Sequence, residues 1–433
     1  MVTYSSGALL SPDEFLTRVY SMKKITIISF LLLVLFVGCS DKDDTGNIVN
    51  EDKIEKFDPV PITKTNPMKV WAHYMPWFED KTTSNNGEWG IHWTMANKNP
   101  DIIDVDGKRQ IAAHYYPLIG PYASSDVDVL EYHFLLMKYA GIDGILIDWY
   151  GTRDLYDYSS NKRNTEAIVA VLEKVGLEFA IVYEDQTLRD EMTSDAARIN
   201  QAILDMQYLE ENFFKKENYI KIDDKPLLMV FGPQIINAPA DWNKVFNSLG
   251  KAPSFFTLYA HSASTNNTTY KNALGEYIWV DGTSMEVKYA NKDNFDEYMG
   301  GAYPGFHDFY KEGGWGNNIL SIGHENGQTF QQSLQMAQDN NMEYLQLITW
   351  NDFGEGTMIE PTQEFQYSFL ESVQDFTGVD YKKSNLEAIY TYYQLKKQFR
   401  DKSKEQKQLT QIFYYLISLQ EEKARKLMEE MVK

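Results

Sequence analysis

Four clusters in the sequence combine polar and aromatic residues at short spacing. They are residues 73–77 (HYMPW), 148–150 (DWY), 183–185 (YED) and 350–355 (WNDFGE), and each closes a short apolar run. Hydrolysis of a glycosidic bond needs one carboxylic acid to protonate the leaving oxygen and a second carboxylate as base or nucleophile. Aromatic side chains offer flat apolar faces to a sugar ring. The clusters therefore indicate glycoside hydrolysis.

The fourth cluster holds the two residues that we expect to be catalytic, Asp352 and Glu355. A single carboxylate at the end of a strand is about as readily explained as the cap of a following helix. Three carboxylate-bearing clusters are harder to explain in that way, so we expect them to share one cleft. The residues expected to bind substrate there are His73, Tyr74, Trp77, His92, Trp93, Asp148, Trp149, Tyr183, Glu184, Tyr303, Trp350 and Asn351.

Other kinds of site have less support in the sequence. His307 with Asp308, and His324 with Glu325, lack metal-ligand spacing such as His-Glu-x-x-His, so we expect no metal site. The sequence has no glycine-rich dinucleotide or phosphate loop and no nucleophile elbow, which disfavours a nucleotide cofactor and a serine hydrolase. The formal net charge of −21 would repel nucleic acid and anionic lipid. We therefore expect a glycan as partner, no cofactor and no nucleic acid.

The elements that must position these clusters alternate between strands and helices. Helical stretches such as 126–139, which begins with Asp and is followed by Gly141, separate the apolar runs. Eight such units over about 300 residues predict a single (β/α)₈ TIM barrel of the α/β class, with its active site at the carboxyl ends of the strands. The expected strands are residues 70–74, 144–149, 179–184, 227–231, 255–259, 277–280, 299–303 and 345–350.

The composition of the chain also predicts its division into regions. Residues 1–39 have the pattern of a processing signal, and residues 40–66 are charged and proline-containing, which is typical of a flexible tether. The barrel is expected to occupy residues 67–400. Because residues 385–400 and 405–431 are amphipathic and rich in Lys, Glu and Leu, we expect a C-terminal helical extension, with a helical tail at residues 401–433.

The N-terminus carries the features of a secretory signal. Two lysines precede the apolar run 25–37, which is shorter than the about 20 residues that span a bilayer and is followed by Gly and Cys39. The motif FVGC resembles a bacterial lipobox, so Cys39 is the expected lipidation site, and residues 1–21 are expected to be a gene-start extension. Residues 40–44 (SDKDD) resemble the export tag of Bacteroidetes surface lipoproteins. We expect an outer-membrane lipoprotein that is exposed at the cell surface or, alternatively, faces the periplasm.

The strand-end clusters resemble those of glycoside hydrolase family 99 and its family 71/99-like relatives, whose members include endo-α-mannosidases of (β/α)₈ fold. The likeness extends roughly from residue 68 to residue 400. Its strongest part is residues 350–360 (WNDFGEGTMIE), which are similar to the family segment Asn-Glu-Trp-x-Glu-Gly-Thr-x-Ile-Glu. Weaker matches are residues 91–93 (IHW), 183–184 (YE) and 303–306 (YPGF).

The resemblance implies a retaining mechanism with two carboxylates. In the family, the first carboxylate of the motif draws the proton from the substrate 2-hydroxyl, whose oxygen attacks C1 to form a 1,2-anhydro sugar. The second carboxylate protonates the leaving oxygen and then activates water. These roles fall to Asp352 and Glu355. The family has Glu where this sequence has Asp352, and a carboxylate displaced by about 1 Å can lose ~10²-fold in rate.

The sequence as a whole favours an endo-acting α-glycosidase for α-mannan-like glycans. One alternative is a surface glycan-binding lipoprotein without turnover, and another is an α-1,3-glucanase like those of family 71. The presence of carboxylates at both Asp352 and Glu355 favours an enzyme, because a binding protein has no need of both. The sequence does not indicate an oligomeric state.

Overall fold

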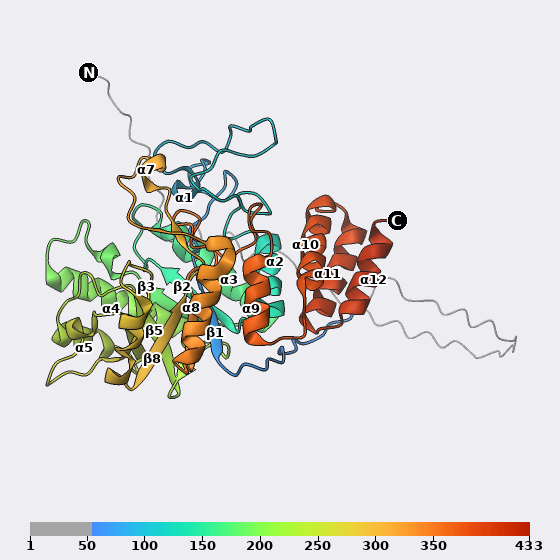
Figure 1. Ribbon diagram of the computed structural model, residues 1–433. Coiled ribbons are helices and arrows are strands. Elements are labelled where there is room, and N and C mark those ends of the chain that lie inside the picture. The colour runs from blue at the N-terminus through green and yellow to red at the C-terminus, as the bar shows by residue number, and fades with distance from the viewer. Residues whose placement is uncertain (1–53) are drawn as a thin grey trace, which may run out of the picture. The chain divides into compact units, whose positions relative to one another are not determined.

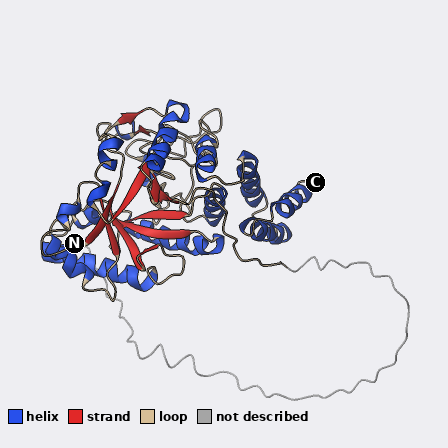
Figure 2. Ribbon diagram, turned by 60° about the horizontal axis from the view of Figure 1, so that its bottom comes forward, coloured by secondary structure: helices blue, strands red, loops and turns tan. Residues whose placement is uncertain are grey.

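A computed structural model describes residues 54–433, and its centre is a closed barrel of parallel strands. The strands follow one another around the barrel in the order β1, β2, β3, β5, β6, β7, β8 and β11, and β11 pairs with β1 to close the ring. Figure 2 shows helices arranged around these strands. The predicted (β/α)₈ TIM barrel is confirmed. The predicted signal, its Cys39 and the first part of the predicted tether lie outside the described residues.

The eight barrel strands fall close to the runs predicted from the sequence. The largest difference is at β7, which begins four residues before the predicted run 277–280. Gly275 lets the backbones of β7 and β8 approach closely, and this glycine and Glu276 interrupt the apolar pattern of the strand. The barrel strands are β1 (Lys69–Tyr74), β2 (Gly144–Trp149), β3 (Glu178–Tyr183), β5 (Lys225–Val230), β6 (Ser254–Leu258), β7 (Ala273–Tyr277), β8 (Glu297–Ala302) and β11 (Tyr344–Leu347), and the short strands are β4 (Lys221–Ile222), β9 (Phe306–His307) and β10 (Ser321–Ile322).

Helices cover the outside of the barrel, as Figure 1 shows. The α-helices are α1 (Ile91–Thr94), α2 (Val127–Tyr139), α3 (Tyr158–Val175), α4 (Asp195–Asn212), α5 (Pro239–Phe246), α6 (Met285–Tyr289), α7 (Tyr310–Gly313), α8 (Gln328–Asp339), α9 (Ser368–Thr377), α10 (Lys383–Gln398), α11 (Ser403–Ile417) and α12 (Glu421–Met431). Short 3₁₀ helices are Asp185–Leu188, Ser262–Ser264, Lys292–Asn294 and Glu325–Gly327.

Helix α2 shows how the sequence builds one of these layers. The side chain of Asp126 accepts a hydrogen bond from the backbone N–H of Asp128 and so caps the helix. Nearly every residue of α2 is buried, because the helix lies between the barrel and α10. Its Glu131 accepts hydrogen bonds from Tyr392 at 2.7 Å and from Lys396 at 2.5 Å, both on α10.

The C-terminal extension consists of three helices. Helix α10 packs on α2, α11 packs on α10, and α12 packs on α11 (Figure 1). The predicted amphipathic stretch 405–431 is divided between α11 and α12, because Leu419 has a positive φ of 60° and turns the chain. Among residues 54–433, no helix is both long and apolar enough to cross a membrane.

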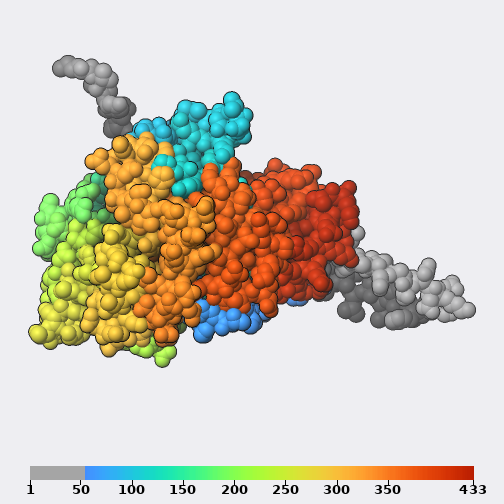
Figure 3. Space-filling view, viewed as in Figure 1, coloured from blue at the N-terminus to red at the C-terminus, as the bar shows by residue number. Residues whose placement is uncertain are grey.

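Residues 54–66, the described part of the predicted tether, lie along the C-terminal helices. The backbone N–H of Val60 donates to the carbonyl oxygen of Ile417 at 3.0 Å. The backbone N–H of Glu55 donates to the Gln411 side chain, whose amide donates back to the Glu55 carbonyl. In Figure 3 the blue start of the described chain lies against the orange and red surface of the C-terminal region. The domain boundaries remain a prediction.

Candidate active site

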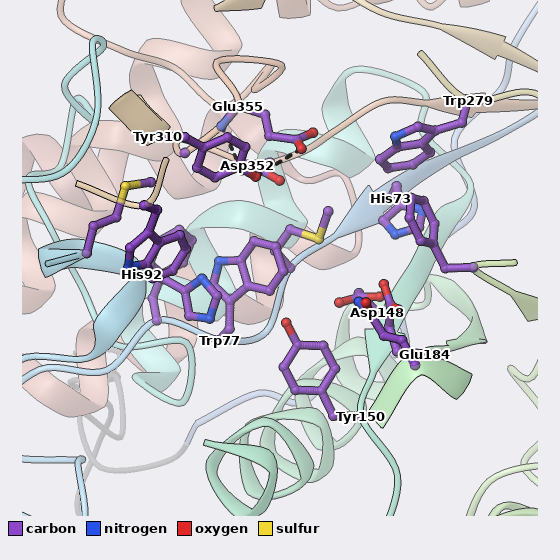
Figure 4. Close-up of a pocket in the computed structure, with 17 residues that line it drawn as sticks. His73, Trp77, His92, Asp148, Tyr150, Glu184, Trp279, Tyr310, Asp352 and Glu355 are labelled. Carbon is purple, nitrogen blue, oxygen red and sulfur yellow. Dashed lines mark hydrogen bonds between the residues drawn. The ribbon is translucent and has the colours of Figure 1, made fainter. Parts of the chain in front are cut away.

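The carboxyl ends of the barrel strands surround a cavity of about 300 Å³. Figure 4 shows carboxylates on two sides of this cavity and aromatic rings between them. The structure brings together both expected catalytic residues and five of the expected substrate-binding residues. The predicted residues that line the cavity are His73, Trp77, His92, Asp148, Glu184, Asp352 and Glu355.

Strand geometry decides which member of each predicted cluster reaches the cavity. Successive side chains of a strand point to opposite faces, and one face of a barrel strand is the interior. His73 on β1, Asp148 on β2 and Glu184 at the end of β3 all point inward. Because β1, β2 and β3 are consecutive around the barrel, these three side chains come together at the floor of the cavity.

The neighbours of these residues point outward and do not line the cavity, which corrects the prediction for Tyr74, Trp149 and Tyr183. Trp149 stacks on Tyr208 of α4 with ring centroids 5.8 Å apart. The Tyr183 hydroxyl donates to Asp205 of α4 at 2.7 Å, and the Tyr74 hydroxyl lies 3.0 Å from a histidine nitrogen of α2. All three aromatic residues fasten helices to the barrel.

Four other predicted binding residues also lie outside the cavity. Trp93 is fully buried and donates from Nε1 to a backbone carbonyl at 2.7 Å. Asn351 accepts from the backbone N–H of Met75 and donates to its carbonyl, which joins the ends of β1 and β11. Trp350 is fully buried next to α2, and Tyr303 makes a backbone hydrogen bond to the Ser333 hydroxyl of α8. Trp93, Trp350 and Asn351 are buried and Tyr303 is half-buried, and none of the four lines the cavity.

Aromatic residues that the sequence did not single out as binding residues complete the wall. Phe231 and Trp279 come one and two residues after the ends of β5 and β7, so their positions at strand ends could have revealed them. Tyr150, which directly follows β2, also lines the cavity. Tyr310 and Trp315 come from α7 and the following loop, where no strand pattern in the sequence indicates a site.

A tight turn holds Asp352 and Glu355 on one side of the cavity. The Asp352 Oδ1 atom accepts the backbone N–H of Glu355 at 2.9 Å. The Tyr310 hydroxyl donates to Glu355 Oε1 at 3.0 Å. Gly356 has a φ of 66°, and a Cβ there would lie 2.7 Å from the carbonyl oxygen of His307, so the turn needs glycine.

The surroundings of the two carboxylates separate their protonation. Burial raises the pKa of Asp352 to about 6, against the opposing effect of the backbone N–H of Glu355. Burial, followed by the charge of Asp352, raises the pKa of Glu355 well above its ordinary value. Glu355 therefore keeps its proton to higher pH than Asp352 does. Two carboxyl groups whose environments separate their pKa values are suited to acid and base roles.

Two histidines of the wall differ in their environment. Burial lowers the pKa of His73 to about 4, so its ring is neutral at neutral pH. The Gln346 side-chain nitrogen donates to a backbone carbonyl, so the atom of Gln346 that faces His73 is its oxygen Oε1. Because this oxygen can only accept, His73 Nδ1 is the donor, at 3.3 Å. His92 stacks on Trp77 with ring centroids 4.2 Å apart and lies 3.1 Å from an Asp157 carboxylate oxygen.

A chain of hydrogen bonds braces the turn from behind. His324 Nε2 donates to the Gly356 carbonyl at 2.9 Å, so Nδ1 of the neutral ring accepts from the Tyr115 hydroxyl at 3.3 Å. The Tyr115 oxygen can then accept from His307 Nδ1 at 3.2 Å. The backbone N–H of His307 donates to the Glu355 carbonyl at 2.8 Å. We call His324, Tyr115 and His307 the brace.

The brace also occupies the histidines that could be considered for a metal site. Within residues 54–433, no group of three or more His, Cys, Asp or Glu residues is placed to hold a metal ion. His307 and His324 face Tyr115, and Asp308 accepts backbone N–H groups of Tyr310 and Ile319. The side chains of His307, His324 and Asp308 are thus engaged with other groups of the protein.

A second cavity of about 790 Å³ adjoins the first. Four residues line both cavities, namely His92, Tyr150, Gln186 and Trp315, so the two form one continuous cleft. The outer part carries the aromatic residues Trp89, Tyr156 and Tyr158, and the Tyr156 side chain is 71 % exposed. The cleft therefore offers further aromatic surface beyond the carboxylates.

Comparison with known proteins finds a similarity to the family that the motifs resemble. The family model of glycosyl hydrolase family 99 matches residues 67–257. The resemblance to family 99 is confirmed. The matched range includes His73, Asp148 and Glu184 and ends before Asp352 and Glu355. The roles of that last pair therefore depend on the family 99 motif in the sequence and on the geometry of the turn.

Two relatives with curated descriptions share about a quarter of their aligned residues with this chain. The chain is 23 % identical over 289 residues to a glycoprotein endo-α-1,2-mannosidase of Xenopus laevis, covering 62 % of this chain. It is 23 % identical over 274 residues to a mouse glycoprotein endo-α-1,2-mannosidase-like protein, covering 58 % of this chain. The chain spans 58 % of the length of each relative.

Solved structures support the family 99 fold. The family 99 endo-α-mannosidase of Bacteroides thetaiotaomicron superposes with a TM-score of 0.55 at 18 % identity, covering 72 % of this chain and 97 % of that chain. A glycoside hydrolase-like protein superposes with a TM-score of 0.52 at 15 % identity, covering 74 % of this chain and 97 % of that chain. At these identities the likeness establishes the barrel fold.

Proposed function

We propose that the protein is a retaining glycoside hydrolase that cuts α-linked, mannan-like glycans within the chain. The observation that carries this proposal is the placement of Asp352 and Glu355 on one wall of a cavity at the carboxyl end of a family 99-like barrel. The active sites of TIM-barrel enzymes lie at this end. The names of the relatives, which describe endo-acting α-mannosidases, support the choice of substrate.

The two carboxylates have separate tasks in this proposal. Asp352 takes the proton from the sugar 2-hydroxyl while that oxygen attacks C1, and Glu355 gives its proton to the leaving oxygen. Glu355 then takes a proton from water, which opens the 1,2-anhydro ring at C1, and Asp352 returns a proton to the 2-oxygen. The strongly raised pKa of Glu355 supports the acid role. The pKa of Asp352 is also raised but is the lower of the two, which supports the base role.

The outer cavity supports cleavage within a chain. An enzyme that removes single terminal sugars needs a closed pocket, whereas an endo-acting enzyme must bind sugars on both sides of the bond. Trp315 and Tyr150 line both cavities, so one glycan can run from the carboxylates past these rings. Exposed aromatic faces such as Tyr156 suit the stacking of further sugars.

The test is a screen of the purified protein lacking residues 1–39 against α-mannans and α-glucans, with products followed by NMR. We expect oligosaccharide products of α configuration from a mannan. Release of single sugars only would contradict endo action, and cleavage restricted to α-1,3-glucan would favour the glucanase alternative. Binding to a mannan without any cleavage would favour the glycan-binding alternative.

We also propose that the protein is an outer-membrane lipoprotein anchored through Cys39 and exposed at the cell surface. This proposal rests on the basic, apolar and small-residue order of the signal and on the acidic residues that follow Cys39. An enzyme at that location would cut large glycans before import. A periplasmic orientation is the alternative that surface proteolysis would reveal.

A further inference from the structure

Asp148 and Glu184 form a second buried carboxyl pair in the cavity. They come from the neighbouring strands β2 and β3, and Figure 4 shows their carboxyl groups next to each other and apart from Asp352 and Glu355. Asp148 is 2 % exposed and Glu184 is 6 % exposed. The Gln186 side chain neighbours Glu184. Within the described chain, apart from the contact between the two carboxyl groups, both oxygens of Asp148 and the Oε2 atom of Glu184 have no hydrogen-bond partner.

The buried carboxylate of Asp205, by contrast, has a hydrogen-bond partner at both oxygens. Asp205 accepts from the Thr152 backbone N–H at 2.9 Å, from the Thr152 hydroxyl at 2.7 Å and from the Tyr183 hydroxyl at 2.7 Å. Buried polar groups in folded proteins are nearly always hydrogen-bonded, and an unpartnered one calls for an explanation. Because Asp148 and Glu184 line the cavity, their missing partners can come from a molecule that enters it.

Two adjacent buried carboxyl groups cannot both be ionised without a large cost, so the pair holds a proton. Burial and then the charge of Asp352 raise the pKa of Asp148, and burial and then the charge of Asp148 raise the pKa of Glu184. Among the described residues that line the cavity, none is Lys or Arg. The titratable groups that face the pair are Asp352, Asp157, Asp185, Tyr150, Tyr277 and the neighbouring His73.

We propose that Asp148 and Glu184 are specificity-determining residues that bind two hydroxyl groups of one sugar ring while sharing one proton. The ionised member accepts a hydrogen bond from one hydroxyl, and the protonated member donates to the other. Neighbouring strands lie about 4.8 Å apart, which lets two side chains reach adjacent hydroxyls of one ring. The choice of a sugar as the ligand rests on the proposed function. The pair disfavours anionic sugars, because no Lys or Arg side chain of the described chain lines the cavity to offset their charge.

The proposal predicts a split between stability and binding. Asp148→Asn and Glu184→Gln each remove a buried, poorly partnered carboxyl group, so the free protein should unfold at the wild-type temperature or higher. Asp205→Asn is the matched control and should lower the unfolding temperature, since the amide presents donors to the donors that surround Asp205. Thermal unfolding without any sugar measures this part.

Binding is measured by calorimetry with α-1,2-mannobiose and with α-1,3-linked glucobiose as probes. The Asp148→Asn/Glu184→Gln double variant should bind the accepted disaccharide on the order of 10- to 100-fold more weakly, the loss expected when hydrogen bonds to a charged group are removed. Asp205→Asn should bind as the wild type does. Wild-type affinity should fall as rising pH removes the shared proton, and Glu184→Gln should not show this fall.

The outcomes separate the pair from the proposed function. Wild-type affinity in the double variant would overturn the proposal, and so would single variants that lose as much stability as Asp205→Asn. If the wild type bound neither disaccharide, the proposed substrate would be wrong. The unfolding temperatures would then decide on the pair alone, because a purely structural pair must lose stability when it is altered.

Discussion

Asp352 and Glu355 lie three residues apart, and the same turn gives them different neighbours. Asp352 is held by the backbone N–H of Glu355, whereas Glu355 receives the hydroxyl of Tyr310. A backbone N–H stabilises the charged form of Asp352, which limits the effect of burial on its pKa. The hydrogen bond from Glu355 thus fixes the orientation of the Asp352 side chain.

Glu355→Gln should lower kcat on a natural mannan by ~10² or more, because the amide keeps the shape of the side chain and cannot donate the acidic proton. An activated substrate whose leaving group needs no proton should lose little in the glycosylation step. Steady-state and burst kinetics on both substrates measure this difference. Wild-type turnover of the mannan by this variant, with unchanged binding, would remove Glu355 from the mechanism.

The activity should have a bell-shaped dependence on pH. The base Asp352 must be ionised, and its pKa is raised to about 6, so kcat/KM should fall as the pH drops through this region. The acid Glu355 must be protonated and has the higher pKa, so activity should fall again when rising pH removes its proton. The profile of kcat/KM against pH measures both limbs as properties of the coupled pair. Full activity at pH 4 would contradict these roles.

At the scale of the elements, successive side chains of a strand point to opposite faces, so each predicted cluster contains residues that face the cavity and residues that face the surrounding helices. The sequence placed all eight strands and the rim that carries the site, since apolar runs and their polar endings are local signals. It did not separate Asp148 from Trp149, because β2 is buried on both faces and its sequence has no polar alternation that marks the inward side. The structure resolves them, as Trp149 packs on α4 and Asp148 lines the cavity.

Trp149→Ala should therefore mainly reduce stability, whereas Trp77→Ala should mainly weaken glycan binding. Trp149 is fully buried against α4, so its loss should reduce the free energy of unfolding by about 3–5 kcal/mol, the usual cost of truncating a buried aromatic residue. Trp77 lines the cavity, so Trp77→Ala should weaken glycan binding with a smaller loss of stability. Denaturant unfolding and calorimetry on both variants provide the comparison. Equal loss of stability would mean that Trp77 also serves packing.

The residues that the sequence could not supply come from long loops. Tyr310 and Trp315 belong to the segment after β9, and Tyr115 to the segment before α2. Their positions depend on contacts between distant segments. Tyr115 contacts His307, 192 residues further along the chain, and Tyr310 contacts Glu355, 45 residues further along. No local periodicity records such contacts.

The brace behind the turn offers a test at this scale. Tyr115→Phe removes the hydroxyl that connects His307 and His324, which should loosen the turn that carries Glu355 and lower kcat on the order of 10-fold. KM should change little, because Tyr115 does not line either described cavity. Tyr116→Phe is the matched control and should keep wild-type kcat. A rise in KM without a fall in kcat would argue against the brace.

At the scale of the whole molecule, the expected anchor is separate from the catalytic barrel. Cys39→Ala should abolish lipidation and release an exported, soluble protein with unchanged kcat and KM, because the barrel lies within residues 69–347. Fractionation of cells into membrane and soluble parts measures the change. Recovery of the variant in the detergent fraction would show that another segment holds the protein at the membrane.

The path of residues 54–66 has a mechanical consequence for such an anchored enzyme. A glycan fibre held in the cleft would pull the protein against its anchor, and the force would enter the described chain at residue 54. Val60 is hydrogen-bonded to Ile417, and Glu55 is hydrogen-bonded to Gln411. In a protein anchored as proposed, tension would thus reach α11 before it reached the first strand of the barrel.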